Sequence, residues 1–409
     1  MSWSTVTLGE LIEIKHGFAF KGKFFSDEGQ YILLTPGNCH ESGGLKLKGS
    51  KEKYYIGDIP EDYLLSAGDL LVVMTDLVNT APILGGAFII PEDQKFLHNQ
   101  RLGLVTLADD RRIHKRFLYY LLNTNNYRGQ VRGSASGATV RHTSPDRIKQ
   151  CKVRIPNSIE EQGRIASILS AYDDLLENNR RRIQLLEHAA QQLYQEWFVR
   201  LRFPGHEHVS TLDGVPEGWA AGVVSDFYST GSGGTPSRKN QDFFTGEIPW
   251  VKTRELNGGF ILSTEERITD EAVERSSAKI FPRQTVLIEM YGATIGESAI
   301  LSEPSATNQA CCAVVPKEPG TSFAHVYLFF RQHKTELIGL GQGSAQNNVS
   351  QQVIKSFTMV LPRKELLESF AESSIPFFDQ IETLQRSNFN LTQARNLLLP
   401  RLMNGVLAV

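Results

Sequence analysis

The chain has 409 residues, roughly two to four times the length of a typical domain, so at least two domains are expected. Its 41% hydrophobic and 22% charged residues exclude the disordered and collagen-like classes. No apolar run reaches the roughly 18 residues of a membrane span, and the N-terminus lacks the layout of a signal peptide, so we expect a soluble, cytoplasmic protein. Without a C-x-x-C motif, the cysteines are expected to be buried free thiols: Cys39, Cys151, Cys311 and Cys312.

The formal net charge of -2 conceals a basic segment in the first half of the chain. Between Arg111 and Arg154 there are eleven basic residues and a single acidic one, Asp146. Such a surplus of positive charge favours a polyanionic partner. A solvated basic face with no partner explains the charge equally well, because net charge produces attraction without specificity.

The first half begins with short apolar, β-branched segments that are broken by Gly, Pro and Asp, which predicts strands. A helical segment at 117–122 follows, then a Gly/Ser-rich loop and an edge strand that ends at Pro156. The segment 158–200 carries apolar residues at steps of three and four, which predicts a long helix with a coiled-coil seam. Residues 201–218 are rich in Pro, Gly and His and are predicted to form a linker. The predicted strands of the first half are 70–74, 87–90 and 102–105.

The second half repeats this order. Residues 137–156 align without a gap on residues 343–362, at an offset of 206. Earlier in each half the offset is 216, which pairs Trp3 with Trp219 and Gly17 with Gly233, and at Asn99 it is 209, which pairs that residue with Asn308. A falling offset indicates small loop deletions within a collinear repeat. Because the unit is about 200 residues long, it is a duplicated module rather than a solenoid repeat.

The C-terminal segment 364–409 carries a second apolar stripe on the same pattern, with Asn388 at one seam position, where a polar residue fixes register. We expect the two helices to lie antiparallel along each other, since a lone helix cannot bury such a stripe. The alternative is that each helix packs on its own β-rich module. The predicted fold class is α+β, with two pseudo-repeated β-rich modules, at 1–157 and 219–363, separated by the two long antiparallel coiled-coil helices.

Catalytic signals are weak. Asp93 and Lys95 form half of a metal-dependent nuclease pattern, with Asp69 as a possible second carboxylate, but the other half has no counterpart. No hydrolase, metalloprotease or dinucleotide-binding fingerprint occurs in the chain. The residues therefore favour a binding protein, while a free-standing metal nuclease and a coiled-coil scaffold without DNA binding remain as alternatives.

Several segments together resemble the DNA specificity subunits of type I restriction-modification enzymes. The first half departs from the pattern at 16–22, where His-Gly-Phe-Ala-Phe-Lys-Gly stands in place of the Gly-Gly-Thr-Pro of the second half. Two modules that read different half-sites should differ in this way. The resemblance is carried by 233–238 (GGTPSR), 246–251 (GEIPWV), 308–309 (NQ), 343–350 (GSAQNNVS), 160–165 (EEQGRI), 169–175 (LSAYDDL), 196–198 (EWF) and 203–205 (FPG).

This resemblance implies a non-catalytic subunit. Its parts would be target recognition domain 1 at 1–157, a central conserved helix at 158–200, the linker at 201–218, target recognition domain 2 at 219–363, and a C-terminal conserved helix at 364–409. Each domain would place loops in the major groove of one half of a bipartite site in double-stranded DNA, and the helices would set the gap between the halves. The implied partners are two methylation subunits, which carry S-adenosylmethionine, and restriction subunits, which use ATP and Mg²⁺; this chain would hold no cofactor.

The same reading assigns individual residues. Amide side chains at Gln346, Asn347 and Asn348 suit adenine, and Arg141 with His142 suits guanine or phosphate. The other predicted DNA-binding residues are Arg128, Arg132, Thr139, Ser144, Thr235, Ser237, Arg238, Lys239, Tyr291, Thr294 and Gln342. The predicted partner-interface residues are Tyr172, Leu175, Leu193, Trp197, Phe198, Leu398 and Leu402.

Overall fold

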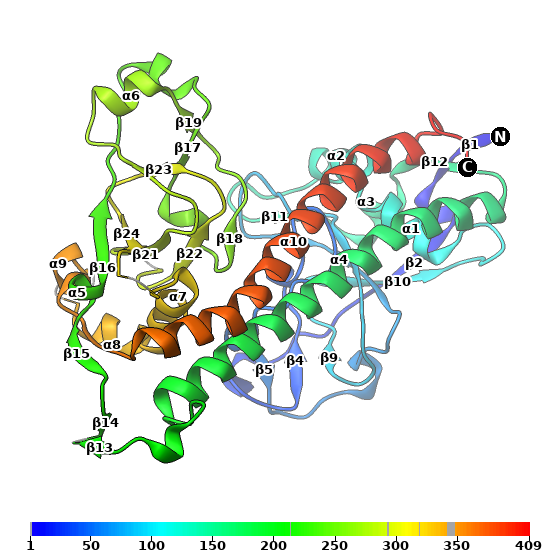
Figure 1. The fold of residues 1–409 in the computed structure, drawn as a ribbon. Coiled ribbons are helices and arrows are strands. Elements are labelled where there is room, and N and C mark those ends of the chain that lie inside the picture. The colour runs from blue at the N-terminus through cyan, green and yellow to red at the C-terminus, as the bar shows by residue number, and fades with distance from the viewer. Residues whose placement is uncertain (1, 213, 293, 319, 342–347) are drawn as a thin grey trace. The chain divides into compact units, whose positions relative to one another are not determined.

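The computed structural model describes residues 2–212, 214–292, 294–318, 320–341 and 348–409 (Figure 1). The chain divides into two compact units: unit 1 is Met1–Asp174 with Leu391–Val409, and unit 2 is Leu175–Asn390. Each unit combines small sheets with helices, which confirms the α+β prediction. The two long helices, α4 (Ile159–Tyr194) and α10 (Lys364–Met403), contribute residues to both units, and a π-helical turn (Gln195–Val199) follows α4.

Unit 1 is built on a four-stranded antiparallel sheet of order β2-β10-β6-β8. All four residues of β6 are buried, as expected for a central apolar strand. Helix α1, which the apolar run at 117–122 predicts, packs its Phe117 and Leu118 into the core beneath this sheet. The strands and α-helices of unit 1, apart from its parts of α4 and α10, are β1 (Trp3–Thr7), β2 (Ile12–His16), β3 (Phe25–Ser26), β4 (Tyr31–Leu33), β5 (Tyr54–Tyr55), β6 (Leu70–Val73), β7 (Thr75–Asp76), β8 (Ala87–Ile89), β9 (Phe96–Leu97), β10 (Leu102–Leu107), α1 (Lys115–Leu121), α2 (Asn125–Gly133), β11 (Arg141–His142), α3 (Pro145–Lys149) and β12 (Lys152–Pro156).

Unit 2 has the equivalent sheet, of order β16-β24-β21-β22-β18, and α7 packs on its core side. Seven of the ten residues of α7 are hydrophobic and buried, because this helix lies between the sheet and α10. Its elements are β13 (Thr211–Leu212), β14 (Val215–Pro216), β15 (Ala220–Val223), α5 (Val224–Phe227), β16 (Tyr228–Ser232), β17 (Ile248–Val251), β18 (Phe260–Ile261), β19 (Arg267–Ile268), α6 (Asp270–Glu274), β20 (Ile280–Phe281), β21 (Val286–Glu289), β22 (Ser298–Leu301), β23 (Ser305–Thr307), β24 (Cys311–Pro316), α7 (Phe323–Gln332), α8 (Lys334–Gly339), α9 (Gln351–Lys355) and β25 (Thr358–Leu361).

Strand registers confirm the internal repeat residue by residue. In unit 1 the first strand pairs with the last, with Ser4 opposite Ile155; in unit 2 Ala220 lies opposite Leu361. These four positions differ by the offsets of 216 and 206 that the sequence alignment contains. The next pair follows the same rule, because β2 and β10 align His16 with Gly103 while β16 and β24 align Ser232 with Cys312. The duplication therefore extends to the hydrogen-bonding register.

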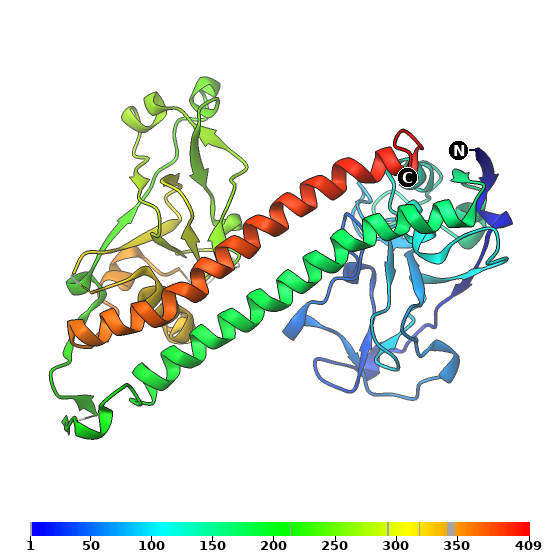
Figure 2. The same cartoon turned by 45° about the vertical axis from the view of Figure 1, so that its right-hand side comes forward.

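The two long helices lie antiparallel within each unit, which confirms the expected pairing (Figure 2). In unit 2 the Asn179 amide donates to the Asn388 Oδ1 at 3.0 Å, and further along the pair the Tyr194 and Phe370 rings are 6.2 Å apart. Asn388 is therefore a polar register residue of the apolar stripe, and its partner on the other helix is Asn179.

In unit 1 the helix pair is tied to the module by a three-member network. The carboxylate of Asp173 on α4 accepts a 2.6 Å bond from the Tyr120 hydroxyl and a 2.6 Å bond from the Arg395 guanidinium on α10. Among the apolar residues that predict this helix, Leu169 and Leu176 are buried, whereas the adjacent Ile168 and Leu175 are exposed. A spacing of three and four allows either of two adjacent apolar residues to lie on the buried face of the helix. Only the element that packs against the helix determines which of them is buried.

The expected thiol chemistry is confirmed, since all four cysteines are free and buried. Burial raises the pKa of the Cys39 thiol to about 12 and that of Cys151 to about 11. None of the helices described is both long and apolar enough to cross a bilayer.

Candidate nucleic-acid interface

Each unit places a loop of its central sheet beside its Gly-rich segment. In unit 1 the backbone N–H of Thr143 donates to the carbonyl of Met74 at 2.9 Å, and in unit 2 Val349 donates to Met290 at 2.8 Å. The two bonds occupy equivalent positions of the repeat, so the loop after β6 and the loop after β21 have the same neighbour. In unit 1 the loop after β6 and the segment that contains Thr143 are together called the loop pair. In unit 2 the loop pair is the loop after β21 and the segment that contains Val349.

The loop pair of unit 1 is a short two-stranded ladder. Strands β7 and β11 align Arg141 with Asp76 and His142 with Thr75, and the Thr75 hydroxyl lies 3.1 Å from Nδ1 of His142. The Arg141 guanidinium donates to the carbonyls of Arg132 and Ala135, at 3.0 and 3.4 Å. Arg141 thus holds the Gly-rich loop in place, while His142 and Thr139 are exposed.

The loop pair of unit 2 joins Tyr291 to Asn348 by an antiparallel bridge. Tyr291, Thr294 and Asn348 are all exposed, so three of the predicted DNA-binding side chains of this unit are accessible to a ligand. Partial burial raises the pKa of the Tyr291 hydroxyl above its ordinary value, and the group is a hydrogen-bond donor at neutral pH with or without this shift. The predicted residues Gln342, Gln346 and Asn347 lie outside the described part of the chain.

Other predicted DNA-binding residues have structural partners. The Arg128 side chain is 5% exposed, and its guanidinium donates to the backbone carbonyls of Glu41 and Pro82. Ser144 accepts from the N–H of Arg147 and so caps α3, which is an N-cap role that a Ser-Pro sequence often indicates. These contacts leave neither side chain free to read a base.

The Gly-Gly-Thr-Pro-Ser-Arg segment is likewise held by contacts within unit 2. The Thr235 hydroxyl donates to Oε1 of Gln309 at 2.5 Å. Arg238 forms two bonds with Glu266, at 2.5 and 2.8 Å, and lies 4.2 Å from the Phe244 ring centre. Arg238 is the main reason that the pKa of Glu266 falls to about 2. The positive charge of Arg238 is thus balanced internally, and only the exposed Ser237 and Lys239 remain available to a ligand.

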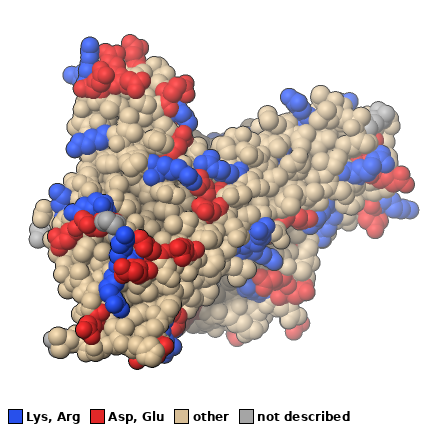
Figure 3. All heavy atoms as spheres, viewed as in Figure 1, with Lys and Arg blue, Asp and Glu red and all other residues tan. Residues whose placement is uncertain are grey.

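Three of the eleven basic residues in segment 111–154 are paired with acidic side chains, and a fourth stacks on an aromatic ring. Its ion pairs join Arg111 to Asp109, Arg112 to Glu10 and Lys149 to Glu13, and Arg154 stacks on Trp3. On the face drawn in Figure 3, basic and acidic residues are interspersed, and acidic residues gather over α6. Attraction to a polyanion in this region would depend on residues such as Arg132 and Arg147, for which the described structure contains no ion pair.

The predicted partner-interface residues divide into buried and exposed sets. Trp197 and Phe198 pack on Phe370 in the core of unit 2, where Leu193 also lies. Leu398 and Leu402 pack in the core of unit 1. Tyr172 is half-buried and Leu175 is 52% exposed, so these two retain the most surface for a partner.

The nuclease reading is wrong. The carboxylate of Asp69 accepts the backbone N–H of Ser66 at 2.9 Å, that of Asp93 accepts the N–H of Ala67 at 2.8 Å, and Lys95 pairs with Glu92 at 3.0 Å. These groups stabilise a turn rather than converge on a reacting phosphate. Over the described residues, no three His, Cys, Asp or Glu side chains are grouped so as to hold a metal ion.

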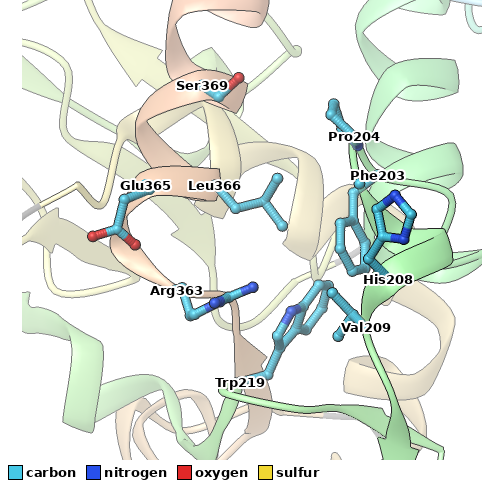
Figure 4. Close-up of a pocket in the computed structure, with 10 residues that line it drawn as sticks. Phe203, Pro204, His208, Val209, Trp219, Arg363, Glu365, Leu366 and Ser369 are labelled. Atoms are coloured by element: carbon cyan, nitrogen blue, oxygen red, sulfur yellow. The ribbon is translucent and has the colours of Figure 1, made fainter.

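The predicted linker packs onto unit 2. Phe203 is buried, with its ring centre 5.3 Å from that of Trp219. A hollow of about 590 Å³ lies between this segment and the start of α10, where Arg363 and Leu366 face the two rings (Figure 4). None of the residues that line the hollow belongs to either loop pair.

A duplicated α+β chain in which each module presents an exposed pair of polar loops defines a two-domain recognition protein. The family model described as type I restriction modification DNA specificity domain matches residues 1–188 and 216–375, and the chain belongs to this family. It is a non-catalytic specificity subunit of a type I restriction-modification system, with two DNA recognition domains.

Relatives named as specificity subunits occur in archaea and bacteria. The chain is 25% identical over 299 residues to that of the enzyme MjaIX of Methanocaldococcus jannaschii, covering 72% of this chain and 69% of the relative. It is 23% identical over 420 residues to that of EcoBI of Escherichia coli, covering 96% and 84%. The crystal structure of the type I S subunit from M. genitalium shares the fold, with a TM-score of 0.64, 15% identity and coverage of 98% and 96%.

Proposed function

We propose that the two domains, at 1–157 and 219–363, each read one half of a bipartite site in double-stranded DNA. The observation that carries the proposal is that the loop pairs occupy equivalent positions of the repeat yet present different side chains. Unit 1 offers His142 and Thr139, whereas unit 2 offers Tyr291, Thr294 and Asn348. One scaffold with two sets of loop residues is what recognition of two different half-sites requires.

The chemistry of these side chains suits the major groove. An amide such as Asn348 can bond both N6 and N7 of adenine, and His142 can donate to guanine or a phosphate. The ladder between β7 and β11 supports this role by holding His142 on a fixed backbone. Since rigid presentation lowers the entropy lost on binding, the ladder favours affinity as well as specificity.

The segments 158–200 and 364–409 would set the gap between the half-sites. Helices α4 and α10 each run without a break from one unit into the other, and the Asn179 to Asn388 bond fixes their register. The modules of a two-domain reader can bind together at only one separation along the duplex. Helix length would therefore determine the number of unread base pairs, and the segment 201–218 would be a packed connector.

The helices would also carry the partners. We assign to this complex two methylation subunits, which hold S-adenosylmethionine, and restriction subunits, which use ATP and Mg²⁺, acting in the cytoplasm. The half-exposed Leu175 and its neighbour Tyr172 supply apolar surface on α4 for such a contact. Cofactor chemistry then lies on the partners, and this chain contributes DNA recognition.

Truncation of the unit 2 loop tests the proposal. Replacing Gln346, Asn347 and Asn348 by Ala should cost about 1–3 kcal/mol for each lost bidentate base contact and relax specificity in one half-site only. Band shifts of the subunit assembled with its methylation partners, together with mapping of modified adenines, measure both effects. Asn390→Ala, an exposed amide outside the loop pairs, is the matched control. Unchanged binding of the triple variant would reduce this loop to a polar surface turn.

A further inference from the structure

We infer that Leu77 and Val78, which begin the exposed loop tip 77–80 directly after β7, recognise the C5-methyl group of thymine in the half-site read by unit 1. This inference rests on the proposed function and names two apolar contacts within it. The two side chains are 58% and 49% exposed, although each is a residue that folding normally buries. They are adjacent in the sequence and lie within the four-residue exposed run 77–80.

The tip is held rigidly from below. Asp76 is 2% exposed, and its carboxylate accepts the backbone N–H of Val78 at 3.0 Å and that of Ile83 at 2.8 Å, which clamps the two ends of the loop together. Ala81 closes the turn with a φ of 51°, in the left-handed region, and its N–H donates to the Val78 carbonyl at 2.9 Å. A loop fixed in this way presents its side chains with little further loss of entropy on binding.

Asp76 also connects this loop tip to the loop pair of unit 1. Asp76 lies opposite Arg141 in the ladder between β7 and β11, so Leu77 begins where that ladder ends. The exposed His142 is the next residue of β11. Two exposed apolar side chains therefore border the polar side chains to which we assign base reading.

Thymine presents a methyl group in the major groove that no other standard base has, and apolar side chains are the groups that contact it. The branched methyl groups of Leu and Val offer such contact and no hydrogen bond. Single exposed hydrophobic residues are ordinary on protein surfaces. Leu77 and Val78 form an adjacent pair on a fixed loop, next to the polar side chains to which base reading is assigned. A ligand that carries an apolar group at this position explains their exposure better.

Uracil substitution isolates the methyl group, since dU keeps every hydrogen-bonding group of dT. Binding of the assembled complex would be measured to its mapped site and to duplexes in which each dT of the unit 1 half-site is replaced in turn by dU. At one or two positions the wild type should bind about 4-fold more weakly, which corresponds to the ~0.8 kcal/mol of one buried methylene-sized group. With Leu77→Ala/Val78→Ala, the same replacement should change affinity by less than about 1.5-fold, because the contact is already absent.

Two controls separate this contact from others. Leu212→Ala removes a leucine that is 78% exposed in β13 of unit 2 and should retain the full dU effect. Val78→Thr keeps the shape of the side chain and should lose part of the dU effect without altering folding. The slope of binding against salt should be the same in the wild type and in the double variant, since no phosphate contact is removed.

Equal dU effects in the wild type and the double variant, or no dU effect at any position, would overturn the inference. A failure of the proposed function looks different, because the wild-type complex would then show no preference for its mapped site over random duplex.

Discussion

Inserting four residues into both long helices should shift the preferred gap between the half-sites by about two base pairs. Four residues lengthen an α-helix by about 6 Å, and B-DNA rises about 3.4 Å per base pair. A module displaced by two base pairs also rotates by about 70° around the duplex, so binding should be restored only on DNA whose gap has grown to match.

The structure indicates where the insertions belong. Breaks at 174/175 in α4 and at 390/391 in α10 fall at the boundaries of the two units. They leave the Asp173 to Arg395 pair within unit 1 and the Asn179 to Asn388 pair within unit 2. An insertion next to Gln385 is less suitable, because the Gln385 side chain accepts the backbone N–H of Phe260 at 2.9 Å.

Modified-adenine mapping of strains that carry the doubly extended subunit measures the gap directly. The recognised half-sites should stay the same while the gap grows. An insertion in α4 alone is the control, and it should impair assembly because the two helices lose register. If the doubly extended protein assembles and still selects the original gap, the helices do not set the spacing.

Gly17→Ala and Gly233→Ala should each destabilise their unit by about 3 kcal/mol or more. A Cβ at Gly17 would lie 2.1 Å from the carbonyl oxygen of Asn99, and one at Gly233 would lie 1.9 Å from that of Thr307. Both clashes are with backbone, which cannot move aside as a side chain can. These glycines are repeat equivalents, so one packing requirement explains both.

Urea unfolding of the full chain, followed by two probes to detect separate transitions of the units, measures the effect. Gly22→Ala is the matched control, because an added Cβ there has open space within 4 Å and Gly22 belongs to the same segment as Gly17. Equal midpoints for Gly17→Ala and Gly22→Ala would mean that the close approach to Asn99 does not exist.

Repeat alignment and helical periodicity predicted the main features of the fold. The offsets reappear in the register of β1 with β12 and of β15 with β25, because a ladder permits no slip without turning buried side chains outward. Asn388 was identifiable as a register residue because it interrupts an apolar stripe. Its partner Asn179 was not, since the stripe does not specify which residue faces it.

The recognition residues were harder to predict, for a physical reason. From the sequence alone, any arginine in a basic segment is a candidate DNA contact. Only the fold shows that Glu266 lies beside Arg238 and that the carbonyls of Glu41 and Pro82 accept from Arg128. Leu77 and Val78 closely follow the predicted strand 70–74, and apolar residues in such a position are usually buried. Asp76, which separates them from that strand, was the available signal that they lie outside it.

The central claim is that each domain specifies one half of the target. Replacing residues 1–157 with the corresponding domain of a relative of known specificity, and mapping modified adenines genome-wide, tests it most directly. We expect one half of the modified sequence to change to that of the relative, while the other half and the gap stay as they were. A change in both halves, or in neither, would contradict the account.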